Sequence, residues 1–285
     1  SVTGEISPEA AAATGLRPGT PVVAGGGDQS ANAVGVGAVN PEVGALSLGT
    51  SGVVFVPTDQ PLVQSQGRVH AFCHAVPGAW HLMGVTMSAA GSLKWLRDEL
   101  APDASWDELT ALAEAVSPGA EGLLFLPYLS GERAPYPDPL ARGAFIGLTV
   151  RHGLGHMVRA VLEGVAFSLR DVFALVSETA PDPLRELRIS GGGSNSPLWR
   201  QIIADVLGVP LSLTRTTVGV ATGGAILAAV GAGWSASVPE ASAAMVEVTS
   251  TTEPGPHAGA YDGAYAVYRS LYPALKDAFA DLAEV

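Results

Sequence analysis

The sequence has little cysteine, little charge and very little lysine. Of its 285 residues one is cysteine (Cys73), 15 % are charged and 6 % are aromatic. A single cysteine excludes an internal disulfide framework and a cysteine-rich zinc site. Lysine occurs only at Lys94 and Lys276, and the net charge is -12 at pH 7. An acidic chain repels nucleic-acid backbones and anionic membranes, so we expect neither as a partner.

The sequence also lacks long hydrophobic runs and, at its start, the basic and apolar segments of a signal peptide. The longest uncharged apolar stretch, 218–238, is interrupted by glycines, and we expect a buried helix there instead of a membrane span. With 47 % hydrophobic residues the chain is too apolar to be disordered and can bury a large core. We expect a soluble, cytoplasmic globular protein.

Apolar residues alternate between strand-like and helix-like spacing along the chain. Strands are predicted over 21–24, 45–48, 53–56, 70–72, 81–83 and 187–189. Helices are predicted over 29–39, 88–100, 155–176, 197–207 and 261–279. In the helix 88–100 we expect Ser88 to be the cap and Leu100 to lie on the apolar face. Strands mixed with helices in this way favour an α/β fold.

Three glycine-rich segments each follow a predicted strand. In the first, 25–29, Asp28 stands where open α/β sheets bind ligands, and it suits a base, a metal ligand or a plain helix cap. The second, 48–52, is a hairpin tip that suits either a phosphate or an ordinary turn. The third, 190–197, leads into a helix capped by Ser196 and suits an anion, a ribose or a simple connection.

Several familiar sites are excluded by their missing residues. The sequence has no phosphate-binding loop of the G-x-x-x-x-G-K-[ST] type, no complete dinucleotide fingerprint and no G-x-S-x-G elbow. The histidines, including His152 and His156 at a spacing of four, lack the carboxylate that a metal site would add, so we expect no histidine metal site. Cys73 is expected to be a small buried apolar residue.

Taken in order, the motifs resemble the FGGY family of carbohydrate kinases and, within it, the xylulose kinases. The resemblance is carried by Gly-Gly-Gly-Asp-Gln (25–29), Leu-Ser-Leu-Gly-Thr-Ser-Gly (46–52), the segments 125–135 and 141–149, the signature-like 156–163, and Ser-Gly-Gly-Gly-Ser-Asn-Ser-Pro-Leu-Trp (190–199). It implies an α/β fold of the actin-like, ribonuclease-H-like type with two lobes. Residues 1–40 would end the sugar-binding lobe and carry the catalytic Asp28, and 41–285 would form the nucleotide-binding lobe. The amino-terminal half of a family member has no counterpart in this sequence.

The resemblance also implies an activity, transfer of the γ-phosphoryl group of ATP to a ketopentose, with D-xylulose 5-phosphate as product. Asp28 would be the general base, would touch Mg²⁺ through water and, with Gln29, would bind the sugar. The nucleotide-binding residues would be Gly49, Thr50 and Ser51 at the phosphates, and Gly192, Gly193 and Asn195 at the adenosine. We expect MgATP as cosubstrate, an amino-terminal lobe as the missing partner, no turnover without it, and a homodimer. The alternatives are another FGGY kinase, for ribulose, gluconate or a polyol, and a non-catalytic nucleotide-binding module.

Overall fold

A computed structural model of the chain describes residues 1–180, 183–216 and 218–285. Its central sheet has seven strands in the order β11-β10-β9-β3-β4-β6-β5, and it is mixed, because only β10, β9 and β3 run parallel to one another. The strands are β3 (Val43–Leu48), β4 (Gly52–Thr58), β5 (His70–Cys73), β6 (Trp80–Thr86), β9 (Glu186–Ser190), β10 (Leu211–Thr214) and β11 (Val248–Thr252). The predicted α/β class is confirmed, and so are the hairpin of β3 with β4 and the pair of β5 with β6.

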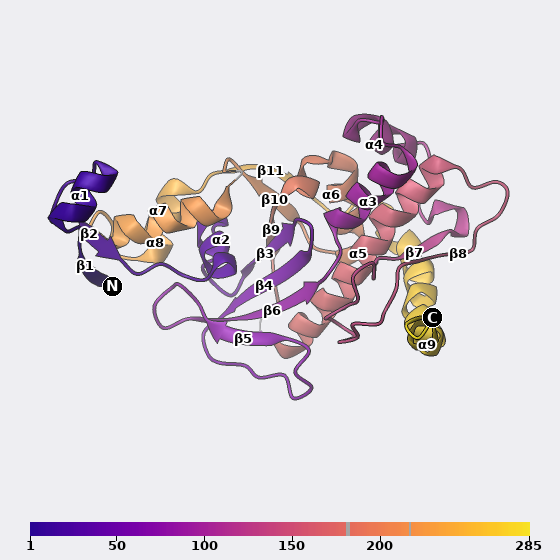
Figure 1. The fold of residues 1–285 in the computed structure, drawn as a ribbon, viewed down its shortest axis with the longest axis horizontal. Coiled ribbons are helices and arrows are strands. Elements are labelled where there is room, and N and C mark those ends of the chain that lie inside the picture. The colour runs from indigo at the N-terminus through magenta and orange to yellow at the C-terminus, as the bar shows by residue number, and fades with distance from the viewer. Residues whose placement is uncertain (181–182, 217) are drawn as a thin grey trace.

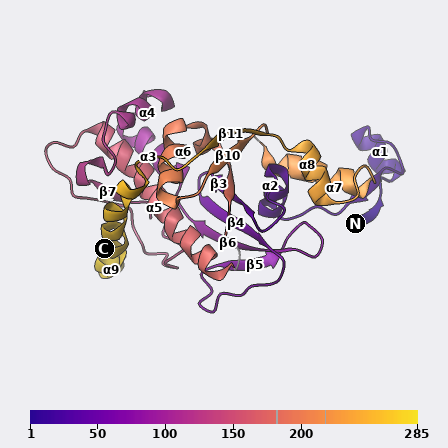
Figure 2. The same cartoon turned by 180° about the vertical axis from the view of Figure 1, so that it is seen from behind.

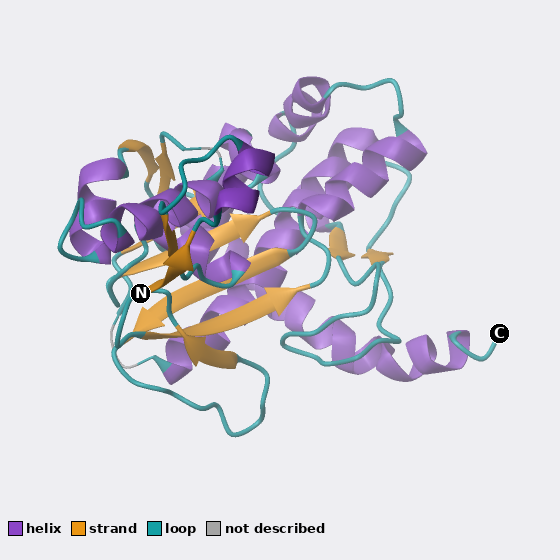
Figure 3. Ribbon diagram, turned by 60° about the vertical axis from the view of Figure 1, so that its left-hand side comes forward, coloured by secondary structure: helices purple, strands orange, loops and turns teal. Residues whose placement is uncertain are grey.

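Helices cover both faces of this sheet (Figures 1, 2 and 3). Along β3 the side chains alternate, so that Leu46 faces the large core around helix α5 (Leu154–Thr179), whereas Ala45 packs in a smaller core with helix α2 (Asp28–Val36). Helix α5 repeats apolar residues at spacings of three and four, which is why it buries one long face. The prediction of this helix is confirmed.

The other elements extend the layer of α5. They are α3 (Ala90–Leu100), α4 (Trp106–Glu114), α6 (Pro197–Leu207), α9 (Tyr261–Leu282), the small sheet of β7 (Leu124–Leu126) with β8 (Ala144–Ile146), and the 3₁₀ turns 120–122, 192–195 and 258–260. The predicted start of α6 is confirmed, because the Ser196 side chain accepts the amide hydrogen of Trp199 and Pro197 occupies the first turn. No helix in the described ranges is long and apolar enough to cross a membrane.

The opposite layer joins the first residues to a late segment of the chain. It contains β1 (Val2–Glu5), α1 (Pro8–Thr14), β2 (Pro21–Val23), α2, α7 (Gly219–Gly231) and α8 (Val238–Met245), and Figure 1 places it at the end of the molecule away from α9. Helices α2 and α7 cross with almost no side chain between them. A Cβ atom added to Gly223 would lie 1.8 Å from the carbonyl oxygen of Ala31, so this crossing requires glycine.

Four local predictions were wrong. The N-cap of α3 is Ala89 and not Ser88, because the amides at this helix start donate to carbonyl oxygens of the 49–51 tip. Leu100 does not lie on the buried face of α3, since it is 49 % exposed. Cys73 is exposed because it ends the edge strand β5. Helix α7 buries only one face, since Val220 on the other is 45 % exposed.

Candidate functional site

The second and third glycine-rich segments meet at one edge of the sheet. Strands β3 and β9 are parallel neighbours with Ser47 opposite Ser190, so their carboxyl ends lie side by side. Gly191 follows β9 with a φ of +93°, and a Cβ atom there would lie 2.6 Å from the carbonyl oxygen of Leu48. Only glycine can make this turn so close to the neighbouring backbone. The hairpin tip and the strand-to-helix turn therefore form one continuous surface.

Backbone contacts with α3 hold the tip 49–51 in place. The amides of Ala89 and Ala90 donate to the carbonyl oxygens of Thr50 (2.7 Å) and Gly49 (2.8 Å), and the amide of Gly49 donates to the Ser51 carbonyl oxygen (3.1 Å). Within the described part of the chain, the Thr50 and Ser51 hydroxyls have no hydrogen-bond partner. The tip is thus fixed through its carbonyls while its hydroxyls stay available to a ligand.

Behind the start of α3, a buried carboxylate anchors the connection from β6. Glu132 is only 5 % exposed, and it accepts hydrogen bonds from the Thr86 hydroxyl (2.6 Å), the Met87 amide (2.9 Å) and its neighbour's amide at Arg133 (2.7 Å). Burial raises the pKa of Glu132, and these hydrogen bonds oppose that rise. Through Thr86 and Met87 this side chain supports the helix start that holds the tip.

The two turns open on a pocket with a volume of about 510 Å³. Five of the predicted nucleotide-binding residues line it together, namely Gly49, Thr50, Gly192, Gly193 and Asn195. The sixth, Ser51, lies at the same tip but not on the pocket wall. Pockets of this size hold a small molecule and bury most of its surface.

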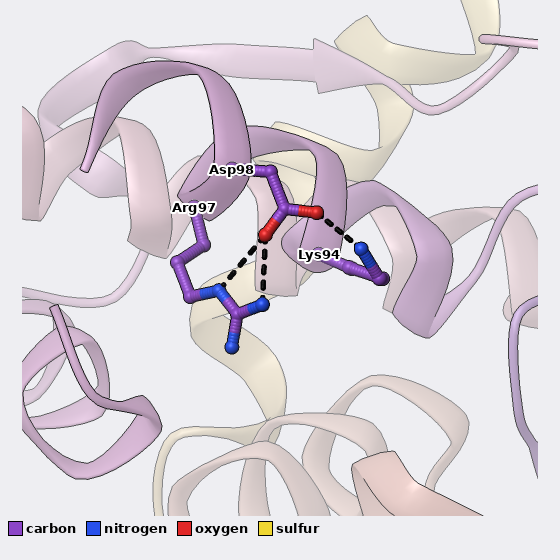
Figure 4. A network of polar contacts seen from close by, with 3 residues as sticks. All are labelled: Lys94, Arg97 and Asp98. Atoms are coloured by element: carbon purple, nitrogen blue, oxygen red, sulfur yellow. Dashed lines mark hydrogen bonds and ion pairs between the residues drawn. The ribbon is translucent and has the colours of Figure 1, made fainter. Parts of the chain in front are cut away.

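The far wall of the pocket comes from α3 and α4, whose lining residues the sequence motifs did not predict. Lys94 contributes from α3, and Trp106, Asp107 and Thr110 contribute from α4. The available signal was the pattern S-x-x-E at Ser105, which forms a complete capping box and fixes the start of α4. In Figure 4, Lys94 and Arg97 both reach the Asp98 carboxylate. Lys94 is the single cation among the described lining residues.

Asp28 lies outside this pocket, at the exposed start of α2. Its Oδ1 accepts the amide hydrogen of Gln29 at 2.8 Å, and Gly27 is the N-cap, so Asp28 is not the capping residue. One turn further, the Asn32 side-chain amide donates to the Ser190 hydroxyl at 3.4 Å, which ties α2 to the end of β9. Residues four apart share a helix face, so Asp28 lies on the same face of α2 as Asn32, the face that meets the carboxyl end of β9.

The described residues do not form a metal cage. No group of three or more histidine, cysteine, aspartate or glutamate side chains comes together in ranges 1–180, 183–216 and 218–285. Mg²⁺ in phosphoryl-transfer sites is usually held by one or two carboxylates, waters and the phosphates of the nucleotide. The exposed Asp28 carboxylate fits such a role for a metal ion that arrives with the nucleotide.

Comparison with known proteins decides the family. Residues 44–232 match the C-terminal domain of the FGGY family of carbohydrate kinases. The chain belongs to this family. The xylulose kinase of Escherichia coli (strain K12) is 45 % identical over 232 residues, which cover 81 % of this chain and 47 % of that protein. The gluconokinase of Bacillus licheniformis is 39 % identical over 70 % of this chain and 41 % of its own.

Solved structures of FGGY kinases confirm the predicted actin-like fold. The xylulose kinase from Rhodospirillum rubrum superposes with a TM-score of 0.87 at 35 % identity, covering 98 % of this chain and 56 % of that one. This FGGY chain spans about half the length of the curated relatives it matches.

Proposed function

We propose that this FGGY chain carries the nucleotide-binding part of a kinase that phosphorylates a ketopentose, with D-xylulose as the preferred acceptor. The observation that carries the proposal is the pocket at the joined ends of β3 and β9, which Gly49, Thr50, Gly192, Gly193 and Asn195 line together. Xylulose kinases among the similar proteins, at up to 45 % identity, support D-xylulose as the acceptor.

In this proposal MgATP lies with its adenosine at 192–195 and its terminal phosphates at the tip 49–51. Asp28 accepts the proton of a sugar hydroxyl while the hydroxyl oxygen attacks the γ-phosphorus. The bond from the γ-phosphorus to the bridging oxygen breaks, and ADP leaves with that oxygen. Because such transition states need mainly positioning and charge neutralisation, backbone amides and hydroxyls at the tip are suitable groups. Asp28 and Gln29 contact the sugar.

The same proposal divides the chain by role. Residues 41–285 form the nucleotide-binding lobe, and residues 1–40 bring Asp28 to the acceptor side. Helix α2, which carries Asp28, packs on α7 and contacts the end of β9. These contacts would hold Asp28 in a fixed position relative to the β9 end of the pocket. Further sugar contacts would come from a second lobe, and without it we expect little or no turnover.

Two alternatives follow from specific observations. The similarity to a gluconokinase makes gluconate a second candidate acceptor, which a panel of sugars separates from D-xylulose. Because the chain spans about half of its relatives, a nucleotide-binding module without transfer activity is the other candidate. That module would bind MgADP and release no ADP from MgATP and sugar.

The first experiment measures MgADP binding by calorimetry and ADP release with MgATP and D-xylulose, for the parent chain and for Asp28→Asn. Asp103→Asn, which changes another exposed aspartate, is the matched control. We expect MgADP to bind both variants as it binds the parent. If the chain transfers phosphate, alone or with an added amino-terminal half, Asp28→Asn abolishes the transfer and Asp103→Asn does not. Normal turnover by Asp28→Asn would refute the role of Asp28.

A further inference from the structure

The pocket presents one exposed aromatic ring to a ligand. Two lining residues are tryptophans, but Trp199 is 1 % exposed and its indole nitrogen donates to the Leu162 carbonyl oxygen at 3.0 Å, so its ring belongs to the core. Trp106, at the start of α4, lines the same pocket and is 43 % exposed. The glycines at 192–193, also on the lining, add no side chains that would occupy the space for a flat ring.

The Trp106 ring is held before any ligand arrives. The guanidinium carbon of Arg97 lies 3.8 Å from the centre of the indole ring and covers one of its faces. Arg97 is itself fixed by Asp98, whose Oδ1 accepts hydrogen bonds from Nε (3.0 Å) and Nη2 (2.7 Å), as Figure 4 shows. The capping box between Ser105 and Glu108 fixes the backbone of the helix turn that carries Trp106. A ring fixed in this way loses little freedom when a ligand stacks on it.

We propose that Trp106 stacks on the base of the bound nucleotide and gives the site its preference for a purine. This inference rests on the proposed function, because it requires a nucleotide in the pocket. The face of the indole opposite Arg97 is the one left for the base. A cation on one face and a base on the other is a favourable arrangement for an aromatic ring, and the two-ring purine overlaps the indole more than a pyrimidine does.

The test compares MgADP and MgCDP binding by calorimetry to the parent chain and to Trp106→Ala, Trp106→Phe and Leu112→Ala. Leu112 lies on the same helix, is 45 % exposed and is not part of the pocket wall, which makes it the matched control. We expect Trp106→Ala to weaken MgADP binding about 10-fold, because stacking contributes on this scale. The same substitution should weaken MgCDP binding less, so the ratio of MgADP affinity to MgCDP affinity should fall.

The conservative variant separates stacking from a structural role. Trp106→Phe keeps an aromatic face and should restore MgADP affinity to within about 3-fold of the parent, whereas Leu112→Ala should not change it. Thermal unfolding of each variant checks that the fold is intact. Unchanged MgADP affinity in Trp106→Ala, or a Phe variant as weak as the Ala variant, overturns the inference and leaves the proposed function standing. A parent chain that binds no MgADP overturns both.

Discussion

The crossing of α2 and α7 can be tested with two neighbouring glycines. An added Cβ atom at Gly223 would lie 1.8 Å from the carbonyl oxygen of Ala31 and 3.1 Å from the amide nitrogen of Gly35. At Gly224, the next residue, it would meet nothing within 4 Å. Since both positions lie inside α7, alanine changes helix propensity equally at each, and only Gly223→Ala forces the two helices apart.

The expected magnitude follows from these distances. To restore an ordinary contact, α2 and α7 must separate by roughly 1.5 Å, against backbone atoms that cannot rotate away. Overpacking of this kind costs about 3 kcal/mol at Gly223, and alanine gains up to about 1 kcal/mol of helix propensity at either position. Because the propensity gain is the same in both variants, their free energies of unfolding should differ by the overpacking cost alone, about 3 kcal/mol.

Thermal unfolding measures this difference directly. For a domain of this size we expect the midpoint of Gly223→Ala to lie about 6–12 °C below that of Gly224→Ala. MgADP affinity should change less than about 2-fold in both variants, because the pocket wall contains neither Gly223 nor Gly224, nor any residue of α2. Equal unfolding midpoints for the two variants would refute the close crossing of α2 and α7.

Three further predictions concern buried titratable groups. Glu132→Ala leaves the Thr86 hydroxyl and the Met87 amide without their acceptor, so we expect a loss of about 3 kcal/mol in urea unfolding, and a loss below about 0.5 kcal/mol would contradict this. In Glu132→Gln the unfolding midpoint relative to the parent should rise with pH above 4.5. The raised pKa makes the parent lose stability as the buried carboxyl ionises, and a pH-independent difference would argue against that burial effect. Burial, followed by the nearby His74, lowers the pKa of His81 from 6.5 to about 4, so the parent loses stability as pH falls through this window. His81→Phe should reduce that loss in unfolding scans between pH 7 and 4, and an unchanged acid transition would exclude His81 as its source.

Elements whose signals are local in sequence were predicted well. The start of α6 depends on a serine cap and a proline in adjacent positions, and its end depends on Gly208 in the left-handed conformation, so neighbours along the chain decide both. The glycine-rich turns after β3 and β9 were likewise readable, because their glycines follow strands directly.

Features that depend on distant contacts were missed. The N-cap of α3 is Ala89 and not the predicted Ser88, because carbonyl oxygens of the tip 49–51 accept hydrogen bonds from the first amides of the helix. This contact joins segments that are far apart in the sequence. The exposure of Cys73 depends on β5 being an edge strand, and strand order is not visible in residue spacing. Trp106 reaches the pocket because α4 packs on α5 beside α3, a placement that the capping pattern at Ser105 does not reveal.

The contacts that build the pocket differ from those that hold Asp28. The pocket depends on the tip carbonyls at the start of α3, on the anchor at Glu132 and on the turn at Gly191. The helix of Asp28 depends instead on the α2–α7 crossing, with Asn32 to Ser190 as a hydrogen bond to the sheet. A change at Gly223 should therefore impair phosphoryl transfer more than nucleotide binding, and a change at Glu132 should impair both. Such a separation would follow from the fold itself, since in the proposed mechanism one set of contacts would position the nucleotide and the other would position Asp28.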